Sequence, residues 1–276
     1  MLAWLSARSQ GFRFHLRIDD LDPQRSKIQH ETSQLADLAA LGLDFDGPVL
    51  RQSERGDAYD TALETLRAQG LLYRCWCTRA EIAGASSAPH GPSAGRYPGT
   101  CRDLSADEIA AREATGRTPS LRVATGNASV TVRDRYQGTV EVQLEDPVVC
   151  RRDGAHAYHL ATVVDDAAQS VTEVVRGEDL LAASATQMWL IERLGLPQPE
   201  YAHVPLVLGP DGARLAKRDG AVTLAERRAL GESTEQTLGL IAASLGLATP
   251  GESVTAQLLL ERFDPDSFTP PPSGPL

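Results

Sequence analysis

The sequence has no long apolar run and no excess of basic residues, and each absence excludes a class of protein. No apolar stretch of the 276 residues reaches the length of about 20 residues that a helix needs to cross a membrane. The printed sequence does not open with a basic segment followed by an apolar core, the pattern of a secretion signal. The balance of 27 basic and 37 acidic residues argues against a surface coated for non-specific nucleic-acid binding, although a local basic groove can lie on an acidic body. These features favour a cytoplasmic protein without a membrane partner, and we expect a monomer.

Length and composition are those of an ordinary globular protein. With 42% hydrophobic and 23% charged residues, the chain can form one large domain with an insertion, or two domains with separate cores. Only four cysteines are present, and three lie between Cys75 and Cys101. This distribution favours a cytosolic metal site over the disulfide framework of a secreted protein.

A short alternating segment near the start of the chain ends in a group of polar residues. Its two faces carry Phe12, Phe14, Leu16 and Ile18 on one side and Arg13, His15, Arg17 and Asp19 on the other. A period of two predicts a β-strand. The run R-I-D-D-L-D-P from Arg17 to Pro23 closes this strand, and open α/β folds bind ligands at the carboxyl ends of their strands. We therefore predict part of an active site here, after a first segment (residues 1–10) that is the end of a helix.

Strand and helix patterns alternate on both sides of a central segment of different character. Helices are predicted at Lys27–Leu41, Asp57–Gln69, Tyr158–Val164 and Glu178–Leu194, and strands at Val171–Val175 and Val204–Leu208. The central segment (residues 73–146) contains a short helix at Ser105–Glu113 and strands at Ser120–Val123, Ser129–Val132 and Thr139–Leu144. The end of the chain is predicted to be helical at Ala221–Leu230, Glu235–Leu245 and Thr255–Arg262, followed by a disordered Pro-rich tail. This order predicts a parallel sheet covered by helices, with an inserted, mostly β module.

The cysteines of the central segment predict a metal site. Cys75 and Cys77 form a C-x-C pair, and Cys101 follows 24 residues after Cys77. Zinc binds four ligands in a tetrahedron, so three thiolates leave one position to fill. The candidates for that position are His90 and Tyr97, with Cys150 a distant third, and ligand chemistry alone favours His90. The alternative is a set of reduced structural cysteines without a metal.

Two further groups of residues are candidates for binding charged ligands. The basic run R-L-A-K-R from Arg214 to Arg218 lies between glycine-rich segments after a predicted strand, where it could neutralise charge that develops on a triphosphate. Arg176 stands at the carboxyl end of another strand, where its guanidinium could hold a carboxylate, and Tyr158 could donate from the same pocket. A solvated loop, a surface ion pair and a packed aromatic ring are the respective structural alternatives. The histidines His156, His159 and His203 have no convincing metal-ligand spacing.

These motifs, in this order, resemble the catalytic half of the glutamyl/glutaminyl class I aminoacyl-tRNA synthetases. The matching segments are Arg17–Pro23, Arg51–Arg55 (R-Q-S-E-R), Tyr73–Arg79 (Y-R-C-W-C-T-R), Ala157–Asp166, Val171–Leu180 and the R-L-A-K-R loop. The resemblance covers residues 2–245. It implies an α/β fold with a Rossmann-like, parallel-sheet nucleotide-binding domain of class I synthetase type, an inserted zinc-stapled, mostly β module and a helical C-terminal segment. The implied divisions are residues 1–72 and 147–220 for the two parts of the catalytic domain, 73–146 for the acceptor module, 221–264 for the helical segment and 265–276 for the tail.

The resemblance also implies ligands and site residues. It places L-glutamate at Asp19, Tyr158 and Arg176, and it places ATP, with Mg²⁺, at Lys217. Lys217 is the central, catalytic lysine of a KMSKS-like loop that consists of Arg214, Leu215, Ala216, Lys217 and Arg218. Catalysis by such a site rests mainly on positioning and electrostatic stabilisation.

Two features narrow the resemblance to the glutamyl-queuosine tRNA(Asp) synthetases. Only 58 residues follow Arg218, too few for the anticodon-binding region of a full glutamyl-tRNA synthetase, and R-Y-P-G-T-C-R at residues 96–102 is similar to the zinc site of the shorter enzymes. In that group the fourth zinc ligand corresponds to Tyr97, so the implied Zn²⁺ ligands are Cys75, Cys77, Tyr97 and Cys101, in place of His90. The implied partner is tRNA(Asp), whose queuosine base accepts glutamate. The alternatives are a glutamyl-tRNA synthetase that charges the tRNA 3′ end and a non-catalytic, zinc-stapled tRNA-binding protein.

The sequence departs from the family pattern at three places. The printed chain contains no A-P-S-P-T-G-type loop with a following H-x-G-H signature, which in the family contacts the ATP phosphates. Asp19 stands where the family usually has glutamate, and Arg214 and Ala216 replace the usual lysine and serine. From the missing loop we expect a start assigned too late and no activation of glutamate by the chain as printed.

Overall fold

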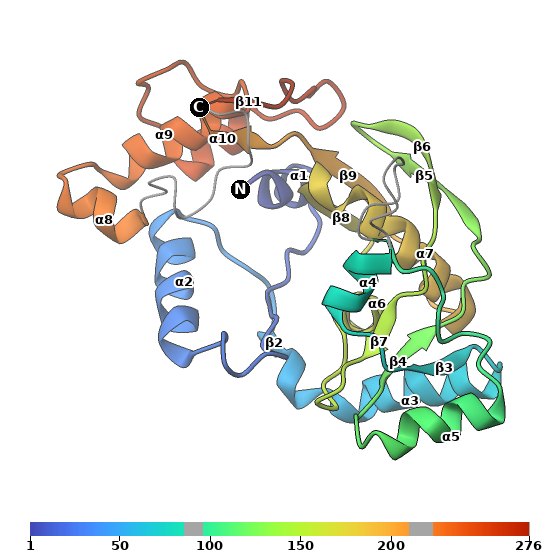
Figure 1. Cartoon of the computed structure of the whole chain (residues 1–276). Coiled ribbons are helices and arrows are strands. Elements are labelled where there is room, and N and C mark those ends of the chain that lie inside the picture. The colour runs from blue at the N-terminus through green and yellow to red at the C-terminus, as the bar shows by residue number, and fades with distance from the viewer. Residues whose placement is uncertain (86–95, 210–222, 276) are drawn as a thin grey trace.

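The main sheet of the protein contains four strands in the order β6-β5-β9-β8 (Figure 1). The computed structural model describes residues 1–85, 96–209 and 223–275. The strands of this sheet are β5 (Ser129–Asp134), β6 (Gly138–Gln143), β8 (Glu173–Gly177) and β9 (Glu200–Val204). Strands β8 and β9 are parallel along their whole length, β5 meets β9 in parallel at Asp134 and Tyr201, and β5 and β6 form an antiparallel hairpin. The predicted α/β class with parallel strands is confirmed.

Three helices pack beside this sheet and form the largest core. They are α3 (Gly56–Ala68), α6 (Tyr158–Ala168) and α7 (Leu181–Leu194). Leu66, Leu160 and Leu190 from these helices are fully buried together with Val132 of β5. Burial of each leucine side chain contributes about 2–3 kcal/mol, so this apolar stripe stabilises the whole face of the sheet. None of the helices in the described ranges is both long enough and apolar enough to span a membrane.

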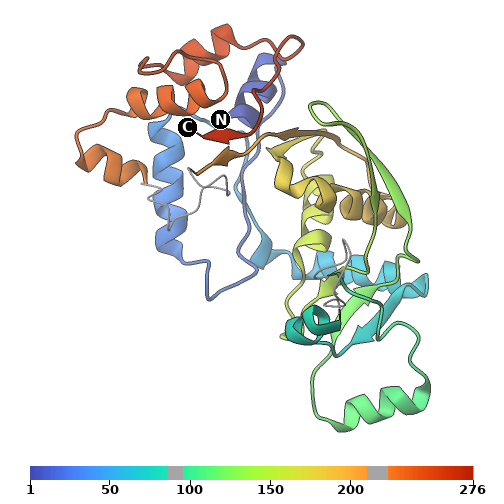
Figure 2. The same ribbon diagram turned by 45° about the horizontal axis from the view of Figure 1, so that its top comes forward.

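A smaller antiparallel sheet carries the cysteines at one end of the molecule. Its order is β3-β4-β7, with β3 (Leu72–Cys75), β4 (Ser120–Val123) and β7 (Val148–Cys150), and it is accompanied by α4 (Arg79–Ala85) and α5 (Ala106–Ala114). Figure 2 shows α5 at the end of the molecule opposite the C-terminal helices. Ser105 and Glu108 form a capping box that satisfies backbone N–H groups where α5 begins. The hairpin β5–β6 also belongs to the predicted insert but extends the main sheet, and the domain divisions stay a prediction.

The two chain ends meet at the other end of the molecule. Helix α1 (Leu2–Ser9) packs against α9 (Thr234–Ser244) and α10 (Ala256–Arg262), and Leu5, Leu238 and Leu259 form their buried core. Figure 1 shows α8 (Leu224–Ala229) and α2 (Ile28–Ala40) near this group, on the side away from α7. Strands β1 (Arg17–Ile18) and β2 (Leu50–Arg51) form a separate parallel pair between the two cores. The predicted helix at the start of the chain therefore corresponds to α1.

Two predicted strands differ in extent from those of the structure. Only Arg17 and Ile18 of the alternating segment are paired as a strand, because the backbone of residues 12–16 bonds instead to the end of α1 and to the segment around Asp46. The strand expected at Val204–Leu208 is divided into β9 and β10 (Val207–Leu208) at Pro205, which has no N–H to donate to a ladder.

The C-terminal tail is not disordered where the structure describes it. Strand β11 (Gly274–Pro275) pairs in parallel with β10, and the Ser273 hydroxyl bonds to Glu178 and accepts from the backbone N–H of Leu206. A proline-rich composition predicts disorder because it offers little apolar surface to bury. Here the tail is ordered because its backbone pairs with the edge of β10.

Candidate functional site

Two adjacent carboxylates near the end of α6 hold the loops that surround the site. Asp165 is completely buried and accepts three hydrogen bonds, from Gln52 Nε2 at 3.0 Å, Arg55 Nε at 2.7 Å and the Tyr59 hydroxyl at 2.8 Å. Burial and the bond to Asp165 raise the pKa of Tyr59 far above its usual range, so its hydroxyl stays a donor. The R-Q-S-E-R segment and the V-V-D-D segment of the sequence therefore meet at one buried ion pair.

The next carboxylate, Asp166, holds the R-I-D-D-L-D segment. Arg17 donates from Nη1 to Asp166 and from Nε to Asp19 Oδ1, the latter at 2.7 Å. Burial alone would lower the pKa of Arg17, but the charges of Asp166 and Asp19 outweigh it and raise that pKa. The Asp19 side chain is about half exposed (46%), so one carboxylate is anchored on Arg17 and still reaches solvent.

Arg176 lies at the carboxyl end of β8, and its guanidinium has one buried edge and one open edge. On the buried edge, Nη2 donates to Ser184 Oγ at 2.6 Å and to Gln187 Oε1 at 2.7 Å, both in α7. On the open edge, Nη1 donates to the Tyr158 hydroxyl at 3.1 Å, and the Tyr158 ring is 40% exposed. The structure thus brings together the predicted pair Tyr158 and Arg176.

A buried His–Asp pair supports the same arginine and was not recognised from the sequence. Arg176 Nε donates to His203 Nε2 at 3.1 Å, and the other ring nitrogen of His203 lies 2.6 Å from Asp134 Oδ2. Both side chains of the pair have no exposed surface. In the sequence, His203 has no convincing metal-ligand spacing, and no local pattern links it to Asp134, 69 positions earlier.

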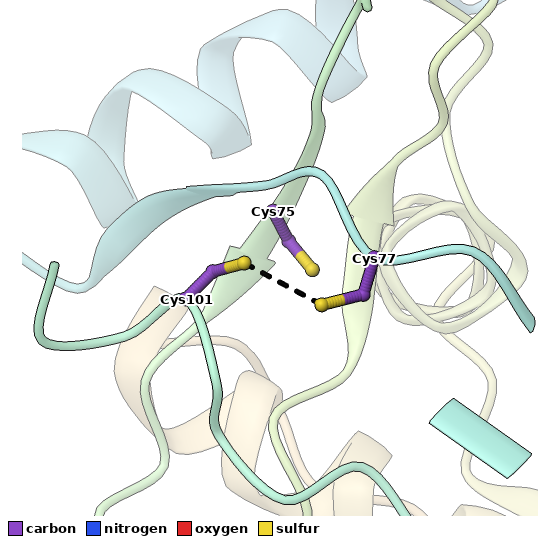
Figure 3. A group of neighbouring side chains, drawn as sticks. All are labelled: Cys75, Cys77 and Cys101. Atoms are coloured by element: carbon purple, nitrogen blue, oxygen red, sulfur yellow. Dashed lines mark hydrogen bonds between the residues drawn. The ribbon is translucent and has the colours of Figure 1, made fainter. Parts of the chain in front are cut away.

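The three cysteines predicted to bind metal converge in space. The sulfur atoms of Cys75, Cys77 and Cys101 all lie within 4.8 Å of one another, and Figure 3 shows them pointing toward a common centre. The Sγ atoms of Cys77 and Cys101 are 3.5 Å apart, and the hydroxyl of the buried Tyr97 is 3.4 Å from Cys75 Sγ. Tetrahedral zinc with bonds of about 2.3 Å requires ligand atoms about 3.8 Å apart, so the three thiols are of a suitable kind and spacing.

The surroundings of the cluster hold its ligand groups in place. Tyr97 accepts from the backbone N–H of Cys101 at 3.0 Å, and the guanidinium of Arg122 lies 3.7 Å from the centre of the Tyr97 ring. Burial raises the pKa of Cys75, but hydrogen bonds from Tyr97, the Cys77 backbone and Arg122 outweigh it and lower that pKa. Cys150 is not part of the group, because its thiol faces the backbone carbonyls of residues 151 and 154.

Two sets of predicted site residues lie outside the described residues. His90 is one, and the loop Arg214, Leu215, Ala216, Lys217 and Arg218 is the other. The KMSKS-like loop therefore stays a prediction, and so does the choice of Tyr97 over His90 as the fourth zinc ligand.

Comparison with known proteins agrees with this arrangement. The sequence model of the family described as tRNA synthetases class I (E and Q), catalytic domain, matches residues 1–255. The chain belongs to this family. The family predicted from the sequence motifs is thereby confirmed, and the remaining comparisons refine the position of the chain within the class I E and Q synthetases.

Curated relatives in this family share about half of their residues with the chain. A glutamyl-Q tRNA(Asp) synthetase of Nocardia farcinica is 52% identical over 267 residues, which are 96% of this chain and 83% of the relative. A glutamyl-Q tRNA(Asp) synthetase of Symbiobacterium thermophilum is 48% identical over 278 residues, with 96% of this chain and 86% of the relative covered. Among solved structures, a glutamate tRNA ligase of Elizabethkingia meningosepticum has a TM-score of 0.79 at 25% identity and covers 99% of this chain. The chain spans 62% of that larger protein.

Proposed function

We propose that this protein activates L-glutamate with ATP to glutamyl-adenylate and transfers the glutamyl group to the queuosine base of tRNA(Asp). The relatives that align with most of the chain are glutamyl-Q tRNA(Asp) synthetases, which supports this assignment. The observation that carries the glutamate site is the contact between Arg176 Nη1 and the Tyr158 hydroxyl at the open edge of the guanidinium. The proposed reaction belongs to the cytoplasm, where tRNA, ATP and glutamate are available.

The charges of the site match those of free glutamate. A carboxylate of glutamate would bind to the open edge of Arg176 beside the Tyr158 hydroxyl, because guanidinium–carboxylate hydrogen bonds are strong and directional. The ammonium group of glutamate would bind to Asp19, whose half-exposed carboxylate is anchored on Arg17. The two opposite charges of the amino acid are thus bound by groups on β8 and at the end of β1.

ATP is proposed to bind at the KMSKS-like loop. Lys217 would stabilise charge on the α-phosphate as pyrophosphate leaves, and Mg²⁺ would accompany the phosphates. The chemistry requires little covalent help from the protein, since holding the glutamate carboxylate near the α-phosphate supplies most of the rate.

Zinc is proposed as a structural ion held by Cys75, Cys77, Tyr97 and Cys101. A bound zinc ion would tie β3 to the segment around residue 101 and stabilise the smaller sheet. In this proposal the ion supports the fold of the predicted tRNA-acceptor module and takes no part in glutamate activation.

The first test measures binding of glutamate and of a non-hydrolysable glutamyl-adenylate analogue by calorimetry. Replacement of Arg176 by lysine keeps the charge but removes the fork, so it should weaken glutamate binding by on the order of tenfold. Arg67→Lys, an exposed arginine paired with Glu64 on α3, is the matched control and should bind glutamate normally. Wild-type protein that binds neither ligand would overturn the proposal.

The second test locates the transferred glutamate. Labelled glutamate, ATP and tRNA(Asp), with or without queuosine, are incubated with the protein, and the tRNA is digested to nucleosides for mass spectrometry. With an A-P-S-P-T-G-type loop and its H-x-G-H signature added ahead of residue 1, the proposal expects glutamate on queuosine and none on the terminal adenosine, whereas the chain as printed should transfer none. Glutamate on the terminal adenosine of tRNA(Glu) would instead identify a glutamyl-tRNA synthetase.

A further inference from the structure

We propose that Asp134 and His203 are positioning residues for Arg176: they hold the Nε edge of its guanidinium and leave one N–H of Nη1 open to a carboxylate of the substrate. This inference rests on the proposed function, since it assigns the pair to the glutamate site. The three residues come from three neighbouring strands, because Asp134 ends β5, His203 lies in β9 and Arg176 lies in β8. In the sheet order β5-β9-β8, Arg176 is paired with His203, and Asp134 is paired with Tyr201, two residues before His203.

Asp134 determines which nitrogen of His203 carries a proton. Its carboxylate accepts from the backbone N–H of His203 at 3.0 Å and from the backbone N–H groups of Tyr136 and Gln137 at 3.0 Å. These hydrogen bonds outweigh burial and lower the pKa of Asp134, so the carboxylate is charged and can only accept. His203 Nδ1, at 2.6 Å from Oδ2, must therefore be the donor.

The opposite nitrogen of His203 is then left with a lone pair. Arg176 Nε is always a donor, and it lies 3.1 Å from His203 Nε2. A proton on Nε2 would face the N–H of a cation, and burial together with the nearby Arg176 keeps the pKa of His203 below its usual value. Neutral His203, protonated on Nδ1, donates to Asp134 and accepts at Nε2 from Arg176 Nε, and the Ser184 hydroxyl lies 3.0 Å from the same nitrogen.

Four of the five N–H groups of Arg176 are bound by the protein, and one is open to a ligand. Nε bonds to His203, and the two hydrogens of Nη2 bond to Ser184 and Gln187. One hydrogen of Nη1 bonds to Tyr158, and the second has no hydrogen-bond partner among the described residues. Four anchored donors fix the plane of the guanidinium, and the remaining donor lies on its open edge.

Holding Arg176 in place before glutamate arrives reduces the entropy that is lost on binding. A free arginine side chain occupies many rotamers, and ordering it on binding would weaken the affinity for a carboxylate. Here the protein orders it before the substrate arrives, at a position held by a sheet and a helix rather than by a loop. A purely structural pair would instead satisfy its own buried polar groups and have no effect on glutamate affinity beyond its effect on stability.

Two substitutions at His203 separate these roles. In His203→Gln the longer amide can present its oxygen where Nε2 lies and still accept from Arg176, whereas in His203→Asn the shorter amide reaches Asp134 only. We expect glutamate affinity to fall by on the order of tenfold in His203→Asn and to stay within about threefold of wild type in His203→Gln, since one hydrogen bond to a charged group is lost in the first variant alone. Affinity for ATP, which Arg176 does not contact in the proposed site, should be the same in all three proteins.

Nuclear magnetic resonance of the histidine nitrogens reports which ring nitrogen carries the proton, and this result does not depend on the stability of the fold. In wild type, His203 Nδ1 should carry the proton and Nε2 should not, and Asp134→Asn should produce a mixture of tautomers together with weaker glutamate binding. This isosteric variant serves if either His203 variant fails to fold, and urea unfolding of each protein reports its stability. Equal glutamate affinity in wild type, His203→Asn and Asp134→Asn, or a protonated Nε2 in wild type, overturns the positioning role. Absence of glutamate binding in wild type overturns the proposed function itself.

Discussion

Arg17, the first residue of β1, forms an ion pair with Asp166 of α6, 149 positions later in the chain, and the same guanidinium donates to Asp19 at 2.7 Å. The separate pair of strands β1 and β2 is thereby tied to the helix that also carries Tyr158. Since Asp19 is the proposed partner of the glutamate ammonium group and Tyr158 lies beside the proposed carboxylate site, this ion pair sets the distance between the two ends of the bound amino acid.

Replacing Asp166 by asparagine should weaken glutamate binding by on the order of tenfold, because Arg17 loses its buried partner and Asp19 loses a fixed anchor. Calorimetry with glutamate measures this change, and urea unfolding shows whether the fold persists. Asp153→Asn is the matched control, since Asp153 is an exposed partner of Arg151 and should leave affinity unchanged. Normal affinity in Asp166→Asn would show that the position of Asp19 does not depend on Arg17.

The neighbouring Asp165 should act on stability more than on binding. Asp165→Ala leaves Arg55 without its carboxylate and removes the acceptor for Gln52 and Tyr59 in a fully buried place. We expect the free energy of unfolding to fall by about 3–5 kcal/mol, the range for removing one partner of a buried ion pair. Urea denaturation measures it, with Asp153→Ala as an exposed control that should change stability by less than about 0.5 kcal/mol. A loss as small as that of the control would mean that water replaces the missing carboxylate.

Local sequence patterns were sufficient to predict many of the elements. The strand at Ser120–Val123 has the predicted bounds, and α3, α6 and α9 differ from their predictions by a few residues, because apolar periodicity and capping residues act over short distances. The cysteine group was also predictable, since thiols that converge on one ion recur at short spacings.

Contacts between distant residues could not be predicted in this way. The link from Asp134 to His203 depends on β5 meeting β9 in parallel, and the link from Arg17 to Asp166 depends on how β1 lies against α6. No local preference of either residue specifies such a meeting, so the supports of Arg176 and Asp19 appear only in the fold. Pro205 shows the converse case, because its missing N–H is a local feature of the sequence that accounts for the break between β9 and β10.

Zinc content should discriminate between Tyr97 and His90 as the fourth ligand. Cys101→Ala should lose the ion entirely, and Tyr97→Phe should retain it poorly during dialysis against a chelator, because the Tyr97 hydroxyl lies 3.4 Å from Cys75 Sγ. His90→Ala should retain zinc as wild type does. Metal content per chain is measured by mass spectrometry, with Cys150→Ala as the control for loss of a cysteine outside the cluster. Zinc lost from His90→Ala but kept by Tyr97→Phe would reverse the assignment.

The pH dependence of stability should carry a contribution from His159, which lies one residue after Tyr158 on α6. Burial, assisted by the positive charge of Arg176, lowers the pKa of His159 from 6.5 to about 4, and its buried Nδ1 has no hydrogen-bond partner among the residues that the structure describes. The folded protein therefore holds His159 neutral while the unfolded chain binds a proton, so its contribution is fully present above about pH 6.5 and is lost as the pH falls toward 4.

This contribution can be isolated with a neutral side chain at the same position. His159→Gln cannot take up the proton, so between pH 6.5 and 4 its stability should fall less steeply than that of wild type, with a total difference of on the order of 3 kcal/mol. The comparison uses the free energy of unfolding in urea, measured for both proteins at about pH 7, 5.5 and 4.5. The exposed His30, replaced in His30→Gln, should leave the slope unchanged. An identical slope in wild type and His159→Gln would mean that His159 is protonated in the folded protein, and that the charge of Arg176 is screened from it.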